Sequence, residues 1–287
     1  MIDTRTIHFI EERLDEKIDD IQVLADTNPS RLFELRGRRR YVLKQTKRVP
    51  LHRQFSTQRK VFDLCRDQTE EMLFSVPEPY LLEPEGRFML MEYVEGDTLL
   101  NRLCRREPGV EDLFHRVGAS LRQYHRVLTA GFNDVKTDLR EYPFMAEVLA
   151  TRHGPAIRAR LARFPAESER VLYKDITPAN VVVSPARRIY FVDVQEDFYG
   201  GPFYYDLARF VDTTLVFSIV RNLHRVWTCY PAARRATTAF LAGYGNTIDG
   251  TLLKSMQSVH RWEHVHIKQT ATPRRALVLK VLYTVLR

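Results

Sequence analysis

An aspartate and an asparagine stand five residues apart in the segment Tyr173-Lys174-Asp175-Ile176-Thr177-Pro178-Ala179-Asn180, and the apolar run 181–183 follows at once. A second apolar run, 190–192, ends at Asp193, thirteen residues after Asn180. If the two runs pair as a hairpin, Asn180 and Asp193 come to lie side by side. They then offer oxygen ligands of the kind that Mg2+ prefers together with substrate phosphates. Asp175 would accept a hydrogen bond from an incoming hydroxyl and orient it.

The elements that must position these residues follow a simple order along the chain. Apolar spacing predicts helices at 4–18 and 52–66, and alternation predicts strands at 21–24, 31–35, 41–45, 74–82 and 87–94. Later helices are predicted at 110–128, within 144–163, and at about 205–228, 232–244, 250–270 and 274–286. A short β island at 171–173, 181–183 and 189–194 interrupts them. Strands followed by helices indicate an α+β protein of two lobes rather than a parallel βαβ sheet.

These motifs, in this order, resemble the aminoglycoside phosphotransferase and choline kinase branch of the protein-kinase-like superfamily. The DxxxxN loop followed by a metal-binding Asp is the arrangement of kinases. Asp206-Leu207-Ala208 matches a further segment of the branch, whose Asp braces the catalytic loop, and the stretch from Leu121 to His125 resembles the end of a helix in the large lobe. The resemblance implies a bilobal fold, with a small β-rich N-lobe over residues 1–94 and a larger, mainly helical C-lobe over residues 95–287.

The resemblance also implies roles for single residues. Asp175 would be catalytic, and Asn180 and Asp193 would bind Mg2+. Lys174, which departs from the family pattern, would either stabilise the charge of the transferred phosphate or merely fill the position. The nucleotide, ATP or GTP, would be bound by the small lobe. There Lys44 would contact the phosphates, Met91 would act as gatekeeper, the backbone of Glu92 and Val94 would bind the adenine edge, and Asn28 and Ser30 would cover the phosphates.

Four departures from the family pattern leave a second hypothesis open. The phosphate-covering segment 24–30 has no glycine, and Tyr173-Lys174 precedes the catalytic Asp where the family has His or a small pair. Gln58 stands where an acid would pair with Lys44, and Val194-Gln195 follows Asp193, with Glu196 and Asp197 as possible substitutes for a second metal contact. The chain is therefore either a kinase acting on a hydroxyl group or a pseudokinase that serves as a nucleotide-binding or partner-binding module.

The charge distribution bears on the acceptor. From residue 207 to the end there are 12 Lys and Arg and three acids, a net charge of +9, which leaves −1 for the first 206 residues. This excess argues against a polycationic aminoglycoside and favours a neutral or anionic hydroxyl compound, such as a sugar, a phosphorylated metabolite or a lipid-linked glycan. The basic and apolar segment 274–287 would either lie on an anionic membrane or pack on the large lobe. Nothing resembles a nucleic-acid-binding motif.

Composition sets the remaining limits. The chain is 44% hydrophobic and 28% charged, as is usual for a globular protein. Its three cysteines, Cys65, Cys104 and Cys229, lack metal-binding spacing and indicate a reducing compartment. No secretory signal is visible, and no apolar stretch is long enough to span a bilayer, so a cytoplasmic protein is expected.

Overall fold

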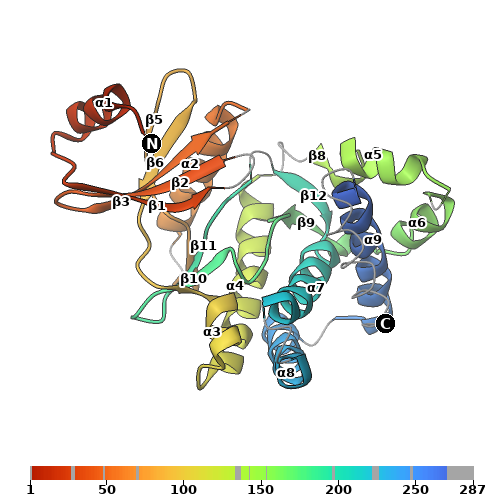
Figure 1. The fold of residues 1–287 in the computed structure, drawn as a ribbon. Coiled ribbons are helices and arrows are strands. Elements are labelled where there is room, and N and C mark those ends of the chain that lie inside the picture. Colours follow the sequence, from red (N-terminus) through yellow and green to blue (C-terminus); the bar gives the residue numbers. More distant parts are fainter. Residues whose placement is uncertain are drawn as a thin grey trace. The chain divides into compact units, whose positions relative to one another are not determined.

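The computed structural model describes residues 2–26, 30–47, 49–68, 71–132, 137–141, 143–152, 154–195, 198–221, 226–245 and 248–269. The chain divides into two compact units. The first unit consists of Met1–Asp67, Ser75–Glu95 and Val194–Asp197, and the second consists of Gln68–Phe74, Gly96–Asp193 and Phe198–Arg287. Each unit is described by itself below, with the element labels of Figure 1.

The first unit is built on an antiparallel sheet with the strand order β1-β2-β3-β6-β5. Its strands are β1 (Asp20–Asp26), β2 (Ser30–Arg36), β3 (Arg40–Thr46), β5 (Pro79–Leu82) and β6 (Phe88–Glu92). Its helices are α1 (Thr4–Leu14) and α2 (His52–Arg66). The Asp3 carboxylate caps α1 by accepting a hydrogen bond from the backbone N–H of Thr6 at 2.8 Å, which satisfies a helix-terminal donor.

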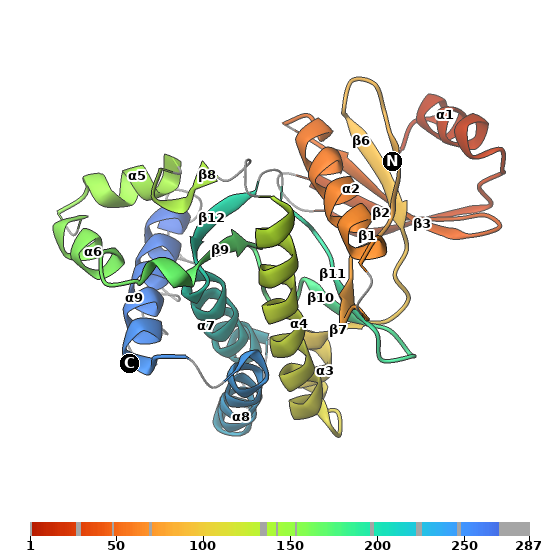
Figure 2. The same ribbon diagram turned by 180° about the vertical axis from the view of Figure 1, so that it is seen from behind.

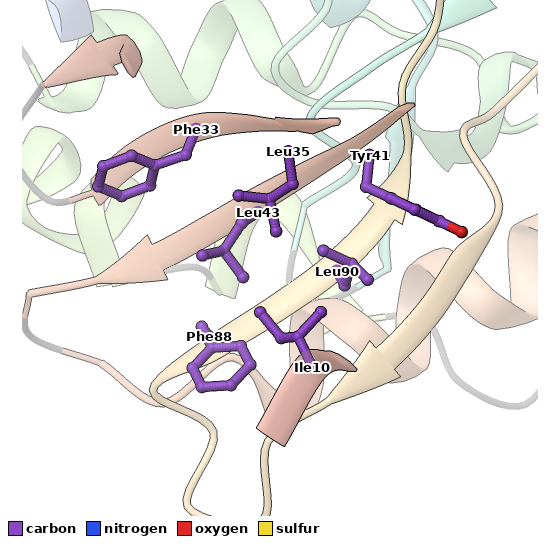
Figure 3. Packing of buried hydrophobic residues seen from close by; sticks show 7 residues of the cluster. All are labelled: Ile10, Phe33, Leu35, Tyr41, Leu43, Phe88 and Leu90. Atoms are coloured by element: carbon purple, nitrogen blue, oxygen red, sulfur yellow. The ribbon is translucent and has the colours of Figure 1, made fainter. Parts of the chain in front are cut away.

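The two faces of this sheet are filled by alternate residues of its strands. On one face Tyr41 and Leu43 of β3 pack with Phe88 and Leu90 of β6 and with Ile10 of α1 (Figure 3). On the other face Met89 and Met91 pack with Leu51, and Val42 and Phe55 lie against them. Because successive side chains of a strand point to opposite faces, Lys44 shares the face of Val42.

The second unit is mainly helical, with two small sheets among the helices (Figures 1 and 2). Its helices are α3 (Leu99–Arg105), α4 (Val110–Gly131), α5 (Pro143–Ala150), α6 (Gly154–Leu161), α7 (Tyr204–Arg221), α8 (Val226–Tyr244) and α9 (Gly250–Gln269). One sheet has the order β4-β11-β10-β7, with β4 (Phe74–Ser75), β7 (Asp97–Thr98), β10 (Val181–Val183) and β11 (Ile189–Phe191). The other has the order β8-β12-β9, with β8 (Thr137–Asp138), β9 (Glu169–Leu172) and β12 (Tyr199–Pro202).

Helices α4 and α8 pack closely because each carries a glycine at their contact (Figure 2). A Cβ atom on Gly118 of α4 would overlap the carbonyl oxygen of Phe240, and one on Gly243 of α8 would overlap the carbonyl oxygen of His115. Both obstacles are backbone atoms, which cannot rotate away as a side chain would. The two glycines therefore set how closely the helices approach.

Replacing Gly243 by Ala is expected to lower the free energy of unfolding by about 1–3 kcal/mol, because the added methyl forces the two helix backbones apart. Gly250→Ala is the matched control, since a Cβ at Gly250 meets nothing within 4 Å. That change should be neutral or slightly stabilising. Urea denaturation followed by circular dichroism measures both. Equal stabilities of the two variants would show that the glycine contact does not limit the helix packing.

Most predicted elements are confirmed, but the boundary between the helices expected at about 205–228 and 232–244 is wrong, because residues 226–231 belong to α8 with Pro231 inside it. Two further predictions are also wrong. The single strand expected at 74–82 is two short strands, β4 and β5, in different sheets, with Pro77 between them. The single helix expected within 144–163 is α5 and α6, separated by a turn at Thr151. The helix expected at 274–286 lies outside the described residues, among which no helix is both long and apolar enough to cross a membrane.

Candidate active site

The segment from Tyr173 to Asn180 forms a tight loop between β9 and β10 in the second unit. The backbone N–H of Asp175 donates to the carbonyl of Tyr173 at 2.9 Å, and that of Asn180 donates to the carbonyl of Thr177 at 3.0 Å. The side-chain amide of Asn180 donates to the carbonyl of Asp175 at 3.0 Å. The two polar residues of the DxxxxN motif are thus tied to each other, and the amide oxygen of Asn180 is left to accept or to bind a metal.

Asp206, at the start of α7, fastens the beginning of this loop. Its side chain is fully buried and accepts the backbone N–H of Tyr173 at 2.7 Å and that of Lys174 at 2.9 Å. It also bonds Nε2 of His125 at 2.9 Å, and Nδ1 of His125 lies 2.8 Å from the hydroxyl of Tyr244. Since a carboxylate only accepts, Nε2 is the donor, and the Tyr244 hydroxyl donates to Nδ1. Asp206 thus braces the start of the loop, as the resemblance implies, and His125 is a buried, hydrogen-bonded residue of α4.

Aromatic side chains pack around Tyr173, at the start of this loop. The ring of Tyr173 lies 5.5 Å from that of Tyr124 and 5.5 Å from that of Phe191, measured between centroids. The Tyr173 hydroxyl donates to the carbonyl of Val192. Burial, and next the negative charge of Asp193, raise the pKa of Tyr173 well above its ordinary value, so this phenol keeps its proton as a donor.

The predicted hairpin that carries Asn180 and Asp193 is present. β10 and β11 are antiparallel, with Val181 opposite Phe191, and the backbone N–H of Val192 donates to the carbonyl of Asn180 at 3.0 Å. Asp193 is the next residue after Val192. The register therefore brings the amide and the carboxylate to the same end of the strand pair.

Lys174 and Asp193 both have left-handed backbone conformations, with φ of 70° and 63°. The other described non-glycine residues with positive φ are Asp15, Arg106 and Arg187, which end helices or lie in the β10–β11 turn. Such conformations cost about 1–3 kcal/mol and are concentrated at functional sites. The backbone strain at Lys174 and Asp193 lowers stability, so its presence in the predicted site is evidence for a functional role of this segment. The Lys174 ammonium lies 4.1 Å from the ring centroid of Tyr199.

Arg209 is a residue that the sequence analysis missed. It lies one turn after Asp206 on α7, and its guanidinium donates to Oδ1 of Asp175. A second nitrogen lies 3.9 Å from the Glu263 carboxylate of α9, which also accepts the hydroxyl of Tyr205 at 3.0 Å. Burial alone would lower the pKa of Arg209, but the charges of Asp175 and Glu263 outweigh it and raise that pKa. Arg209 therefore stays charged and holds the Asp175 carboxylate.

The residues predicted to bind nucleotide lie in the first unit. Lys44 is in β3 opposite Met89, Met91 is buried in β6, Glu92 ends β6, and Ser30 begins β2. Val94 lies in the segment that follows β6. Asn28, Glu196 and Asp197 lie outside the described residues.

Gln58 of α2 packs against the face of the sheet that carries the Met91 side chain. Its side-chain N–H2 donates to the carbonyl of Pro77 at 2.8 Å and contacts the Met91 sulfur at 3.7 Å. Its buried Oε1 has no hydrogen-bond partner among the described residues. Gln58 thus contacts β6 at Met91, and its substitution for the acid expected to pair with Lys44 stays a prediction.

The donor groups of the candidate metal site determine which ion it can hold. No group of three or more His, Cys, Asp and Glu side chains among them is placed to hold a metal ion. The predicted pair consists of one amide oxygen and one carboxylate, which fits Mg2+, an ion commonly held by one or two carboxylates together with substrate phosphates and water. It does not fit a structural Zn2+ site, which needs four nitrogen or sulfur ligands.

Comparison with known proteins gives one consistent result. No protein-family model and no curated protein sequence matches this chain. Solved structures do. The apo form of a thermostable mutant of aminoglycoside phosphotransferase APH(4)-Ia matches with a TM-score of 0.62 and 14% identity over 98% of both chains. The streptomycin-ATP-APH(2")-IIa complex matches with a TM-score of 0.61 and 14% identity over 97% of this chain and 96% of that one.

A third match is the GDP and kanamycin complex of APH(2")-IIia, with a TM-score of 0.59 and 13% identity over 98% of both chains. The protein thus has the protein-kinase-like α+β fold in the form found in aminoglycoside phosphotransferases. The fold predicted from the sequence is confirmed. At these identities the likeness concerns the fold alone.

Proposed function

We propose that the protein is a Mg-dependent phosphotransferase that moves the γ-phosphoryl group of ATP or GTP to a hydroxyl group. The observation that carries this proposal is the way the loop of Asp175 and Asn180 is held. Asp206 fixes its backbone, and the side-chain amide of Asn180 is tied to the Asp175 carbonyl. Placing catalytic groups rigidly is the main task of an enzyme of phosphoryl transfer, where the protein contributes positioning and charge rather than covalent chemistry.

In this proposal Asp175 orients the acceptor hydroxyl and accepts its proton as the new bond forms. Asn180 and Asp193 would hold a Mg2+ ion, which would neutralise part of the phosphate charge. Lys44 contacts the phosphates, and Lys174 adds positive charge to the transferred group. Met91, Glu92, Val94 and Ser30 serve the nucleotide base and phosphates, as the resemblance implies.

The acceptor is proposed to be a neutral or anionic hydroxyl compound, such as a sugar or a lipid-linked saccharide. The three acids after Asp206 are already engaged. Asp212 is held by Arg261 at 2.8 Å, Asp249 accepts the N–H of Thr251 at 2.7 Å, and Glu263 faces Arg209. Two of the three are thus paired with arginines, and the described part of this region offers little negative charge to the amino groups of an aminoglycoside. The known structures with streptomycin and kanamycin therefore indicate the fold and not this substrate.

One observation favours the alternative, a pseudokinase that binds nucleotide or a partner without turnover. The ion pair with Arg209 occupies Oδ1 of the carboxylate that would receive the acceptor proton. Gln58, in place of an acid, would also weaken the hold on Lys44. A pseudokinase would bind nucleotide weakly or without metal.

A thermal-shift titration with ATP and GTP, with Mg2+ and with EDTA, tests the proposal. Saturation to about 100 times Kd adds about 2.7 kcal/mol, which for a chain of this size corresponds to a Tm increase of roughly 5 °C. The increase should need Mg2+ and should be lost in Asn180→Ala and Asp193→Ala. Arg188→Ala, an exposed change in the same hairpin, is the control. A shift that survives EDTA and both substitutions would contradict the metal site and support the pseudokinase.

A further inference from the structure

The second unit contains an open cavity of about 760 Å³ that the proposed reaction does not use. Its wall is formed mainly by the C-terminal half of α4, with contributions from β9, Phe203 and the end of α8. Such a volume lies in the range of sites for small molecules. The catalytic residues Asp175, Asn180 and Asp193 are not among the twelve described residues that line it.

The cavity wall is strongly basic. Arg122, Arg126 and Arg170 line it, and none of its described lining residues is Asp or Glu. Arg122 and Arg126 are four residues apart on α4 and so lie on the same side of the helix, where like charges repel each other. Arg170 reaches the cavity from β9, with one nitrogen bonded to the carbonyl of Glu169 at 2.6 Å. Guanidinium groups from two elements at one cavity are suited to phosphate, which they bind through paired N–H groups.

The cavity wall also has an apolar part, which offers an aromatic surface beside the arginines. The rings of Phe203 and Tyr244 stack with centroids 5.2 Å apart and an interplanar angle of 28°. Both residues line the cavity. A ligand that carries phosphate groups on a carbon skeleton can therefore contact cations and an aromatic surface at once.

The same wall is the first part of a hydrogen-bond chain to the catalytic loop. Tyr244 and His125 line the cavity and bond each other at 2.8 Å. His125 bonds Asp206, and Asp206 holds the backbone N–H groups of Tyr173 and Lys174. The side chains of Tyr244, His125 and Asp206, which form this series of hydrogen bonds, are all buried. A ligand against Tyr244 thus touches a network that ends one residue before Asp175.

We propose that this cavity is a binding site for a small organic phosphate, separate from the nucleotide site, and that its occupancy stabilises the catalytic loop through Tyr244, His125 and Asp206. The ligand belongs to the class of phosphorylated metabolites, since the three arginines select anionic groups and the cavity volume admits a small molecule. The site does not depend on the proposed phosphotransferase activity. It would be present in a pseudokinase as well.

Binding is tested with inorganic pyrophosphate, titrated calorimetrically into the full chain in EDTA without nucleotide. We expect saturable binding that Arg122→Gln weakens by about tenfold or more, because a hydrogen bond to a charged group is worth about 1.5–3 kcal/mol. Arg116→Gln, an exposed change on the same helix outside the cavity, should leave the affinity unchanged. Loss of binding in Lys44→Ala but not in Arg122→Gln would overturn the proposal, because pyrophosphate would then occupy the nucleotide site.

A second measurement tests the connection to the loop and guards against a variant that merely misfolds. Amide hydrogen exchange at residues 173 and 174 should slow when pyrophosphate is added to the unaltered chain. In Tyr244→Phe, which keeps the ring but removes the hydroxyl, pyrophosphate should still bind without this slowing. Unchanged exchange in the unaltered chain at saturating pyrophosphate would overturn the proposed connection.

Discussion

Asp175→Asn should reduce phosphoryl transfer by a factor of about 10²–10⁴, the usual contribution of a positioned general base, while leaving Mg-nucleotide binding intact. The amide that replaces the carboxylate cannot take the acceptor proton. Nucleotide binding should survive because Asn180 is tied to the backbone carbonyl of Asp175 and not to its side chain. Labelled γ-phosphate transfer and the thermal shift with Mg-ATP measure the two properties separately.

Arg209 supplies the control for this experiment. Arg209→Lys keeps a cation near Asp175 but loses the fork of nitrogens that reaches both Asp175 and Glu263. It should therefore lower kcat less than Asp175→Asn does. Normal turnover by Asp175→Asn would remove Asp175 from the mechanism, and the ion pair with Arg209 would then be structural only.

Asp206→Ala is expected to cost about 3–5 kcal/mol of unfolding free energy, because each buried donor that is left without its acceptor costs about 1–3 kcal/mol. The change leaves the backbone N–H groups of Tyr173 and Lys174 without their acceptor, and it removes the acceptor of His125. Chemical denaturation at neutral pH gives the difference. Asp249→Ala should cost only about 1 kcal/mol, because Asp249 caps an exposed helix end.

The activity of Asp206→Ala provides a second check. Any fraction that remains folded should show reduced kcat, since the start of the catalytic loop has lost its brace. A variant as stable as the unaltered protein would show that the buried contacts of Asp206 contribute little, and the account of how the loop is held would fail.

The sequence predicted those parts of the site that depend on residue type and spacing. Asp175, Asn180 and Asp193 lie on one loop and one hairpin, so their relation follows from local structure. Asp206 was predicted through the family resemblance. Arg209 was not, because its partner Asp175 is 34 residues away and one arginine among many carries no signal. The spacing of Asp206 and Arg209 on a helix was the one clue available.

In the fold, too, the elements set by short segments of sequence were predicted, and those set by contacts between distant segments were not. Strands β2 and β3 and helix α2 were predicted closely, because alternation and helical spacing are properties of short segments. Strand β12 was missed since Gly200, Gly201 and Pro202 are residues of turns, yet it pairs with both β8 and β9. The basic cavity was beyond prediction, because it depends on how α4, α8 and β9 pack together.

Helix α7 carries three residues that fix other parts of the second unit at set positions along its length. Asp206 holds the loop that precedes Asp175, Arg209 holds the Asp175 carboxylate, and Asp212 holds Arg261 of α9. The three residues follow each other at intervals of three, so they lie along one side of the helix. Inserting or deleting a single residue between positions 206 and 212 would turn part of this side by about 100°. Any change in the length of this stretch should therefore disturb at least one of the three contacts, whichever residue is inserted or deleted.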